Sequence, residues 1–302
     1  MTARPLSFGL MVLQNRPWAE LVDSWQTAER LGFDSVWVAD HLANGLQPER
    51  PWFEGWTTLA AMAAETERIR IGTLVASITL RAPVLMAKQA VTIDHLSGGR
   101  LELGIGAAGS KLDHALLGEE PWPPAERTGR FREYVEALDG ALRGHAGYDG
   151  RHYRVAEQQL SPEPVQRPRP PLTIAAWSPR NIRLAAEVGD GWNTMGGNRL
   201  DAEQGLAAVR EQGALLDQAC EELGRDPATI RRSLLVGKFW IAATPFASEQ
   251  AFREFVAAYR ETGIDEFIFY YPPEPFLPEG SVGAGVFERV AADVIPELKA
   301  AT

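Results

Sequence analysis

The feature that most constrains the fold is an alternation that runs along the whole chain. Short apolar runs typical of buried strands alternate with longer amphipathic stretches typical of helices. The expected strands are Leu6–Leu13, Ser35–Ala39, Ile69–Ala76, Leu101–Ile105, Leu172–Ala176, Gly191–Thr194, Leu234–Ile241 and Glu266–Tyr270. The expected helices are Trp18–Leu31, Trp56–Glu65, Val84–Leu96, Arg127–Leu142, Ser178–Val188, Ala202–Leu223, Ser248–Thr262 and Val286–Lys299. This order in 302 residues predicts a (β/α)8 TIM barrel.

The alternative fold is an open, doubly wound sheet. It would want a Gly-rich nucleotide fingerprint after the first strand, and residues 13–17 are nothing like one. We therefore expect a single barrel domain over residues 1–302, with insertions at the C-terminal mouth. One irregular excursion is expected at about 143–171, where closely spaced prolines forbid a helix and favour extended chain.

Composition excludes several classes of partner. The formal net charge of −10 argues against nucleic acid or an anionic membrane surface. No apolar run approaches the length of a membrane span. Cys220 is the single cysteine and suits a reducing compartment. We expect a cytoplasmic protein with neither a nucleic-acid nor a membrane partner.

Asp40 and His41 stand at the C-terminal end of the second expected strand. In a parallel barrel these strand ends form the rim of the active site. A histidine there can donate or accept a proton near neutral pH, and a neighbouring carboxylate can fix its tautomer. We predict that both residues are catalytic. The structural alternative is that Asp40 caps a turn while His41 packs beneath it.

Two further strand ends are rich in small residues. One is the segment 71–77, which contains Gly72, Ala76 and Ser77, and the other is the segment 101–110, which contains Gly104, Gly106 and Gly109. Because small residues let a flat ring approach the backbone, we expect these strand ends to make space for a planar ligand.

Two later segments are candidates for binding a phosphate. In the first, Ala176, Trp177 and Ser178 lead into a helix, with Ser178 expected as the N-cap and a proline at the first helical position. Free amides at a helix start attract phosphate, although an ordinary capped helix explains the pattern equally well. The second segment is a loop containing Thr194, Gly196 and Gly197.

The sequence lacks the motifs that are typical of several kinds of catalysis. The five histidines show no metal-binding spacing, so we expect no metal. The chain has neither a Gly-x-Ser-x-Gly elbow nor a plausible cysteine nucleophile. A barrel with a crevice for a flat, phosphate-bearing ligand then suggests a cofactor that carries the reaction itself.

Several segments of the sequence, in their order along the chain, resemble the bacterial luciferase-like flavin-dependent oxidoreductases, and together they cover most of the chain. The matching segments are Gly32–Trp37 with Asp40-His41, Ile71–Thr73, Asp94–Arg100, Leu103–Gly106 and Ala185–Trp192. The most specific is the Ser-Gly-Gly-Arg turn that precedes a Gly-x-Gly strand. Under this resemblance His95 belongs to a structural turn.

The resemblance implies a cofactor at the barrel mouth, either reduced FMN or coenzyme F420. The Asp-His pair slightly favours F420. The implied cofactor-binding residues are Thr73, Leu74, Val75, Gly106, Ala107, Ala176, Trp177, Ser178, Thr194, Gly196 and Gly197. A non-prolyl cis peptide is implied at Leu74–Val75.

The two cofactors imply different reactions. F420 would exchange a hydride with a small organic substrate, with His41 as the acid/base or charge-stabilising group. Reduced FMN would activate O2 through a C4a-peroxide and oxygenate the substrate, with a separate flavin or F420 reductase as a possible partner in supplying the reduced cofactor. A homodimer is also implied. A non-catalytic flavin-binding barrel and, more weakly, a metal-independent hydrolase are the alternatives from other classes.

Two departures bear on the substrate. Sugar-phosphate dehydrogenases of this family have a glutamate where Gly109-Ser110 stand here, and a tryptophan where Asn44-Gly45 stand here. These departures put a sugar phosphate in doubt, and the substrate is not identified by the sequence.

Overall fold

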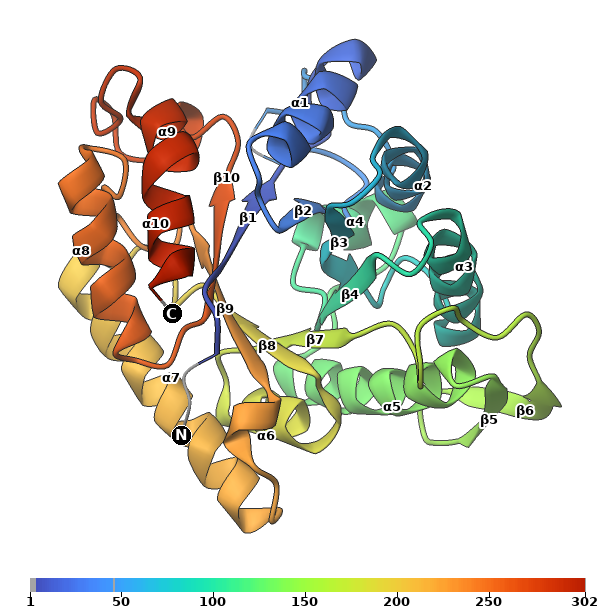
Figure 1. The fold of residues 1–302 in the computed structure, drawn as a ribbon. Coiled ribbons are helices and arrows are strands. Elements are labelled where there is room, and N and C mark those ends of the chain that lie inside the picture. The colour runs from blue at the N-terminus through green and yellow to red at the C-terminus, as the bar shows by residue number, and fades with distance from the viewer. Residues whose placement is uncertain (1–3, 46, 302) are drawn as a thin grey trace. The chain divides into compact units, whose positions relative to one another are not determined.

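The computed structural model of the chain describes residues 4–45 and 47–301. Its barrel strands are β1 (Ser7–Met11), β2 (Ser35–Val38), β3 (Arg70–Ser77), β4 (Leu101–Gly106), β7 (Leu172–Ala175), β8 (Gly191–Thr194), β9 (Arg231–Val236) and β10 (Glu266–Tyr270). They close a barrel in the order β1-β10-β9-β8-β7-β4-β3-β2 (Figure 1). The predicted (β/α)8 fold is confirmed.

Helices follow the strands along the chain, as the sequence pattern predicts. They are α1 (Trp18–Arg30), α2 (Gly55–Glu65), α3 (Pro83–Leu96), α4 (Lys111–Leu117), α5 (Pro124–Leu142), α6 (Pro179–Val188), α7 (Ala202–Glu222) and α8 (Glu249–Arg260). The last helical stretch consists of α9 (Val286–Arg289), a π-helical turn (Val290–Val294) and α10 (Ile295–Ala300). Between α5 and β7, the strands β5 (His145–Asp149) and β6 (Arg154–Gln159) pair antiparallel.

The chain divides into two compact units. The first unit contains the chain up to Val12, Gln26–Val36 and Ala176–Thr302, and the second contains Leu13–Trp25 and Trp37–Ala175. In the first unit, β1, β10, β9 and β8 pair in parallel. In the second, β3, β4 and β7 do so.

Each unit has its own buried core. Aromatic rings pack between strands and helices in the first unit, where Phe246 lies 5.1 Å from Phe269 and 5.4 Å from Phe252 between ring centroids. In the second unit Trp37 packs against β3. A Cβ on Gly72 would lie 2.6 Å from the Trp37 ring and 2.4 Å from the Glu102 carbonyl oxygen, so this close approach requires glycine.

The seventh expected strand, Leu234–Ile241, is displaced toward the N-terminus in the structure. The observed strand, β9, begins at Arg231 and ends at Val236, and the chain turns at Gly237, whose carbonyl accepts from the amides of Trp240 and Ile241. Arg231 forms an ion pair with Glu266, and Arg232 forms one with Asp217. These pairs let two charged residues begin a barrel strand, which a hydrophobicity pattern cannot anticipate.

Helix α4 was not expected from the sequence. The Ser110 hydroxyl caps its start by accepting from the amide of Asp113 at 3.1 Å. Gly118 ends it with a left-handed φ of 73°. Both signals are visible in the sequence, but the helix has only 7 residues.

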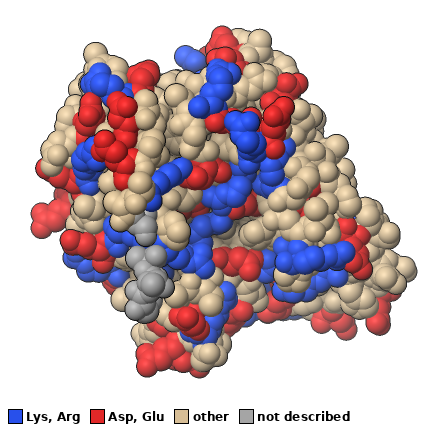
Figure 2. Space-filling view, in the orientation of Figure 1, with Lys and Arg blue, Asp and Glu red and all other residues tan. Residues whose placement is uncertain are grey.

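Charge is distributed in pairs over the surface. Basic and acidic side chains lie next to one another on the face drawn in Figure 2. Examples from the first unit are Arg289 with Glu249 at 2.8 Å and Lys299 with Asp34 at 2.7 Å. Among residues 4–45 and 47–301, no helix is long and apolar enough to cross a membrane.

Candidate active site

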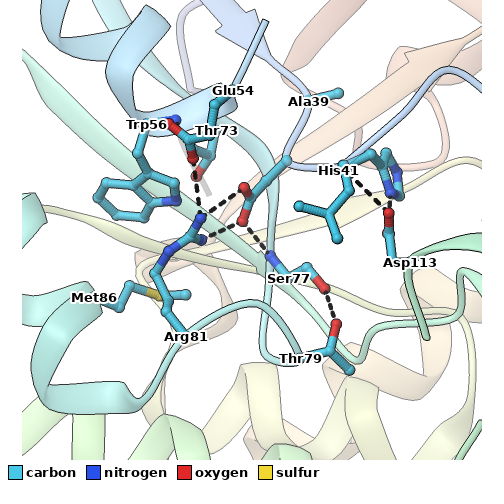
Figure 3. A network of polar contacts seen from close by, with 12 residues as sticks. Ala39, His41, Glu54, Trp56, Thr73, Ser77, Thr79, Arg81, Met86 and Asp113 are labelled. Carbon is cyan, nitrogen blue, oxygen red and sulfur yellow. Dashed lines mark hydrogen bonds and ion pairs between the residues drawn. The ribbon is translucent and has the colours of Figure 1, made fainter. Parts of the chain in front are cut away.

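Asp40 lies in a closed ion-pair cluster at the ends of β2 and β3 (Figure 3). Its carboxylate accepts two hydrogen bonds from the Arg81 guanidinium, at 2.5 and 3.0 Å, and a third from the amide of Ser77 at 2.9 Å. Arg81 also reaches Glu54, which caps α2, at 3.2 Å. Both Asp40 and Arg81 are buried. Asp40 is therefore bound through both carboxylate oxygens to other groups of the protein.

His41 has a different partner and a different environment. Its Nδ1 lies 2.7 Å from the carboxylate of Asp113 on α4, and the amide of Leu42 donates to the other oxygen of that carboxylate at 2.9 Å. The His41 side chain is 46% exposed and that of Asp113 only 2%. Figure 3 shows the His41–Asp113 contact apart from the cluster around Arg81.

The expectation that the neighbouring acid orients the histidine is corrected by this geometry. Asp40 is committed to Arg81, and Asp113, from a helix that the sequence did not reveal, takes its place. Burial works against ionisation of Asp113, but the hydrogen bonds from His41, Leu42 and Ser110 together hold the pKa of its carboxyl below the ordinary value. The ionised carboxylate can only accept, so Nδ1 of His41 donates and Nε2 is left for other partners.

The strand ends predicted to receive a planar ligand divide into buried and accessible residues. Thr73 is fully buried, and its hydroxyl donates to the Gly104 carbonyl at 2.8 Å. Leu74 is buried too, whereas Val75 and Ala107 are half-buried. The implied cis peptide between Leu74 and Val75 is present.

The Gly-x-Gly strand has a packing role that the sequence did not indicate. A Cβ on Gly104 would lie 2.3 Å from the Thr73 carbonyl oxygen, and one on Gly106 would lie 2.4 Å from Cγ2 of Val75. The space beside both glycines is thus filled by β3. Close packing of β3 against β4 explains these residues without a ligand.

Arg127 is a candidate that sequence reasoning missed. It lies in the second turn of α5, and its Nη1 is 3.7 Å from the position of a Cβ on Gly109, just beyond the end of β4. The guanidinium is half-buried and has no hydrogen-bond or ion-pair partner among the residues that the structure describes. The nearby Arg130, by contrast, pairs with Glu126 at 2.8 Å and stacks over Trp122. An unpaired cation at a strand end suits an anionic ligand group.

In the first unit, the helix start at Ser178 is formed as predicted, with Pro179 at the first helical position. The Ser178 side chain makes no capping hydrogen bond, and Trp177 is exposed. Ala176 is tied to β8, because its carbonyl accepts from Nε1 of Trp192 at 2.8 Å. Ser178 and Trp177 therefore remain free to meet a ligand, whereas Ala176 has a packing role.

The loop containing Thr194, Gly196 and Gly197 is closed by internal hydrogen bonds. The Thr194 hydroxyl donates to Gln212 at 2.5 Å and accepts from the Gly196 amide at 3.0 Å. The Gly197 amide donates to the Met195 carbonyl at 2.8 Å. Neither glycine amide is free in this arrangement, which argues against the predicted phosphate contact through them.

The resemblance places His95 in a structural turn; in the structure it lies in the last helical turn of α3, directly before the turn that ends at Arg100. Its Nε2 lies 2.8 Å from the Glu163 carbonyl oxygen. Arg100, at the end of the same turn, donates to the carbonyls of Ala63, Thr66 and Ile69. Within the described parts of the chain, no group of three His, Cys, Asp or Glu side chains could hold a metal ion.

Comparison with known proteins places the chain in a family. The family model described as luciferase-like monooxygenase matches residues 5–286. An F420-dependent glucose-6-phosphate dehydrogenase of Beutenbergia cavernae is 38% identical over 207 residues, which are 65% of this chain and 59% of that protein. A putative coenzyme F420-dependent oxidoreductase of Mycobacterium tuberculosis is 33% identical over 58% of this chain and 49% of its own length. This chain thus matches about half to three fifths of these two relatives.

Solved structures share the fold at low sequence identity. The coenzyme F420-dependent tetrahydromethanopterin reductase of Methanopyrus kandleri superposes with a TM-score of 0.76 at 15% identity, over 98% of this chain and all of that one. EDTA monooxygenase of Chelativorans sp. BNC1 gives 0.75 at 16% identity, over 99% and 94% of the two chains. Both have the same fold as this chain.

Proposed function

This chain belongs to the luciferase-like monooxygenase family, and from that premise we propose that it is an F420-dependent oxidoreductase that exchanges a hydride with a small organic substrate. The observation that carries the proposal is the half-exposed His41, held by the buried carboxylate of Asp113 at the end of β2. The names of the relatives support F420 as the cofactor.

The residues present fit a phosphate-bearing flavin or deazaflavin. Within the second unit, Arg127 offers an uncommitted guanidinium beside Gly109. Val75 and Ala107 are accessible at their strand ends and can contact a ring. When bound, F420 supplies a ring carbon that gives or takes the hydride.

His41 and Asp40 take different roles in this proposal. His41 is the catalytic residue: its Nδ1 is fixed by Asp113, so Nε2 holds or moves the proton that accompanies the hydride. Asp40 is a positioning residue, which joins the end of β2 to Ser77 and to Arg81. We propose that the whole chain acts as one barrel domain, with Asp113 completing the site.

A sugar phosphate is not the substrate that we propose. Gly109-Ser110 and Asn44-Gly45 lack the acidic and indole groups expected for one. Asn44 is buried, and its side chain accepts from the Gln47 amide at 3.1 Å, while Gly45 lies against Leu112. Asn44 thus stabilises a turn, and Ser110 caps α4.

Reduced FMN is the second candidate cofactor, which the description of the family model favours. It would make the protein a monooxygenase that uses O2 and depends on a separate reductase. Both cofactors have phosphate-bearing side chains, so the phosphate groups do not distinguish them. A homodimer also belongs to this proposal and is checked by light scattering.

The deciding experiment is a binding titration of the purified protein with F420 and with FMN, each oxidised and reduced. We expect F420 to bind more tightly, and a panel of small alcohols, ketones and enones then to reveal turnover by the change in F420 absorbance. Preference for reduced FMN would establish the second candidate. Binding of neither cofactor would refute both.

A further inference from the structure

A cavity of about 380 Å³ lies at the N-terminal ends of β9 and β10, within the first unit. Its wall comes from the chain just before β1, from α7 and the turn that precedes β9, and from the segment that joins α8 to β10. Sites for small molecules have volumes of roughly 300–1,000 Å³, so this cavity has room for one. Because the reaction of a TIM barrel takes place at the C-terminal ends of its strands, the cavity is not part of the site described above.

Asp265 is a buried acid in the wall of this cavity, with 5% of its surface exposed. One carboxylate oxygen accepts from the amide of Arg232 at 3.0 Å, and the other accepts no hydrogen bond from the residues that the structure describes. Burial raises the pKa of the Asp265 carboxyl to about 6, because the hydrogen bond from Arg232 and the charge of Arg4 offset only part of the lost hydration. A cationic group in the cavity would supply the counter-charge that this carboxylate lacks.

Two arginines in the same wall keep N–H groups that are not used by the protein. Nε of Arg4 donates to the Ala228 carbonyl at 2.9 Å, while its two terminal nitrogens donate to no group in residues 4–45 and 47–301. Arg260 donates only to backbone carbonyls, those of Arg4 and Ile264. Guanidinium groups bind carboxylates through paired N–H groups, so both arginines suit an anionic ligand group.

The third arginine of the wall is already paired. Arg232 forms an ion pair with Asp217 on α7, so its charge is compensated within the protein. In the described part of the chain, Arg4, Arg260 and Asp265 have no such ion-pair partner. The wall therefore offers both cationic and anionic groups to a ligand.

We propose that this cavity binds a small zwitterion of amino-acid size, whose carboxylate accepts from Arg4 and Arg260 and whose ammonium group donates to Asp265. A purely anionic ligand would leave the buried carboxylate without a counter-charge, and a purely cationic one would leave the two guanidinium groups without an acceptor. Such unmet partners weaken binding, because a buried polar group that loses its water needs a replacement. This second site goes beyond the proposed function and does not depend on it.

L-Alanine, propionate and ethylamine are the probes, because propionate lacks the ammonium group of alanine and ethylamine lacks its carboxylate. Their binding to the full chain without F420 is measured by NMR titration at about pH 8, where the Asp265 carboxyl is ionised. We expect alanine to bind about tenfold more tightly than either analogue, since each analogue loses a charge-assisted hydrogen bond. The other common L-amino acids are titrated next to find the side chain that the cavity prefers.

Asp265→Asn tests the acidic side of the cavity. Asparagine keeps an oxygen that can accept from the Arg232 amide, so we expect the fold to be retained and the tenfold preference for alanine over propionate to disappear. Asp34→Asn is the matched control, since Asp34 also accepts from the amide of a barrel-strand residue, Phe8 at 2.8 Å, but lies outside the cavity wall. The control should keep the preference.

Arg260→Gln tests the basic side. It should weaken the binding of both alanine and propionate about tenfold and leave that of ethylamine unchanged, because only the first two carry a carboxylate. The matched control is Arg253→Gln on the same helix, where the arginine is paired with Glu297 outside the cavity. It should leave all three affinities near those of the wild type.

Three results would overturn the proposal. The first is that no amino acid in the panel binds, and the second is that propionate or ethylamine binds as tightly as alanine. The third is that Asp265→Asn and Asp34→Asn, both folded by circular dichroism, show the same preference for alanine. Because every titration is made without F420, these outcomes are independent of whether F420 is the cofactor.

Discussion

Asp40 and His41 are neighbours in the chain, yet they lie in opposite environments. Asp40 is 1% exposed and its carboxylate is filled by Arg81 and Ser77. The His41 side chain is 46% exposed, and only one of its ring nitrogens is held by the protein. The first cluster is closed and the second keeps one polar atom available.

The difference separates two uses of the same kind of residue. A buried carboxylate paired with a buried guanidinium contributes mainly by fixing the two strand ends that it joins, and removing one partner is costly. A carboxylate that holds one nitrogen of an exposed imidazole leaves the other nitrogen for a substrate. A mutation of Asp40 should therefore lower mainly the stability of the protein, whereas a mutation of the adjacent His41 should lower mainly its activity.

The largest effect is expected for His41→Gln. Loss of a positioned acid or base typically lowers turnover about 10²- to 10⁴-fold. We expect this loss in kcat/KM for the first substrate found in the panel, with only a small fall in the unfolding midpoint, because Gln can still donate to the Asp113 carboxylate. His95→Gln is the matched control and should keep its activity. Equal losses of kcat/KM in both variants would show that activity does not depend on His41 in particular.

The next effect, on stability, is expected for Asp40→Asn. The change leaves the Arg81 guanidinium buried without a full counter-charge, which should lower the free energy of unfolding by about 3–5 kcal/mol. Urea unfolding followed by circular dichroism measures it. An exposed ion pair gives the control: Glu297→Gln, which removes the partner of Arg253, should cost less than about 1 kcal/mol. A loss of activity at full stability would instead place Asp40 in the chemistry.

A smaller effect is expected for Asp113→Asn. Loss of a charged hydrogen-bond partner of His41 should lower kcat/KM by about ten- to a hundredfold, equivalent to about 1.5–3 kcal/mol. The pKa of Asp113 is held below its ordinary value in the folded protein. The ionised form is thus favoured by folding, and its stabilisation is present above the unfolded pKa of about 3.9.

That stabilisation should disappear as the pH falls through the lower, folded pKa. The difference in unfolding free energy between wild type and Asp113→Asn should therefore shrink from pH 7 to about pH 3. Urea titrations at a series of pH values measure it. A difference that stays constant with pH would show that the carboxylate charge has no part in holding His41.

Much of the fold and part of the site were predictable from the sequence. The barrel, most of its strands, the helix start at Ser178 and the cis peptide at Leu74–Val75 agree with the pattern or with the family resemblance. Apolar periodicity is a local signal, so it identifies elements well. It failed where charge interrupts a strand, as at Arg231-Arg232.

Partner choice within the site was not predictable, because it depends on contacts between distant residues. Asp113 is 72 positions from His41, and Arg81 is 41 positions from Asp40. Adjacency in the sequence suggested an Asp40–His41 pair, whereas each side chain found its partner in another segment. The packing role of Gly104 and Gly106 was not predictable for a similar reason, since the groups that fill the space beside them lie on β3.

The smallest effect is expected on cofactor binding. Here the unpaired Arg127 is compared with Arg130, which is paired with Glu126. Replacing Arg127 with Gln should weaken F420 binding about tenfold, because a charge-assisted bond to phosphate is lost. Binding of the phosphate-free deazaflavin riboside should not change. Arg130→Gln, which removes an arginine already paired with Glu126, should leave both affinities near those of the wild type. If Arg127→Gln weakened the binding of both ligands equally, Arg127 would contribute to the packing of the binding site and would not contact the phosphate.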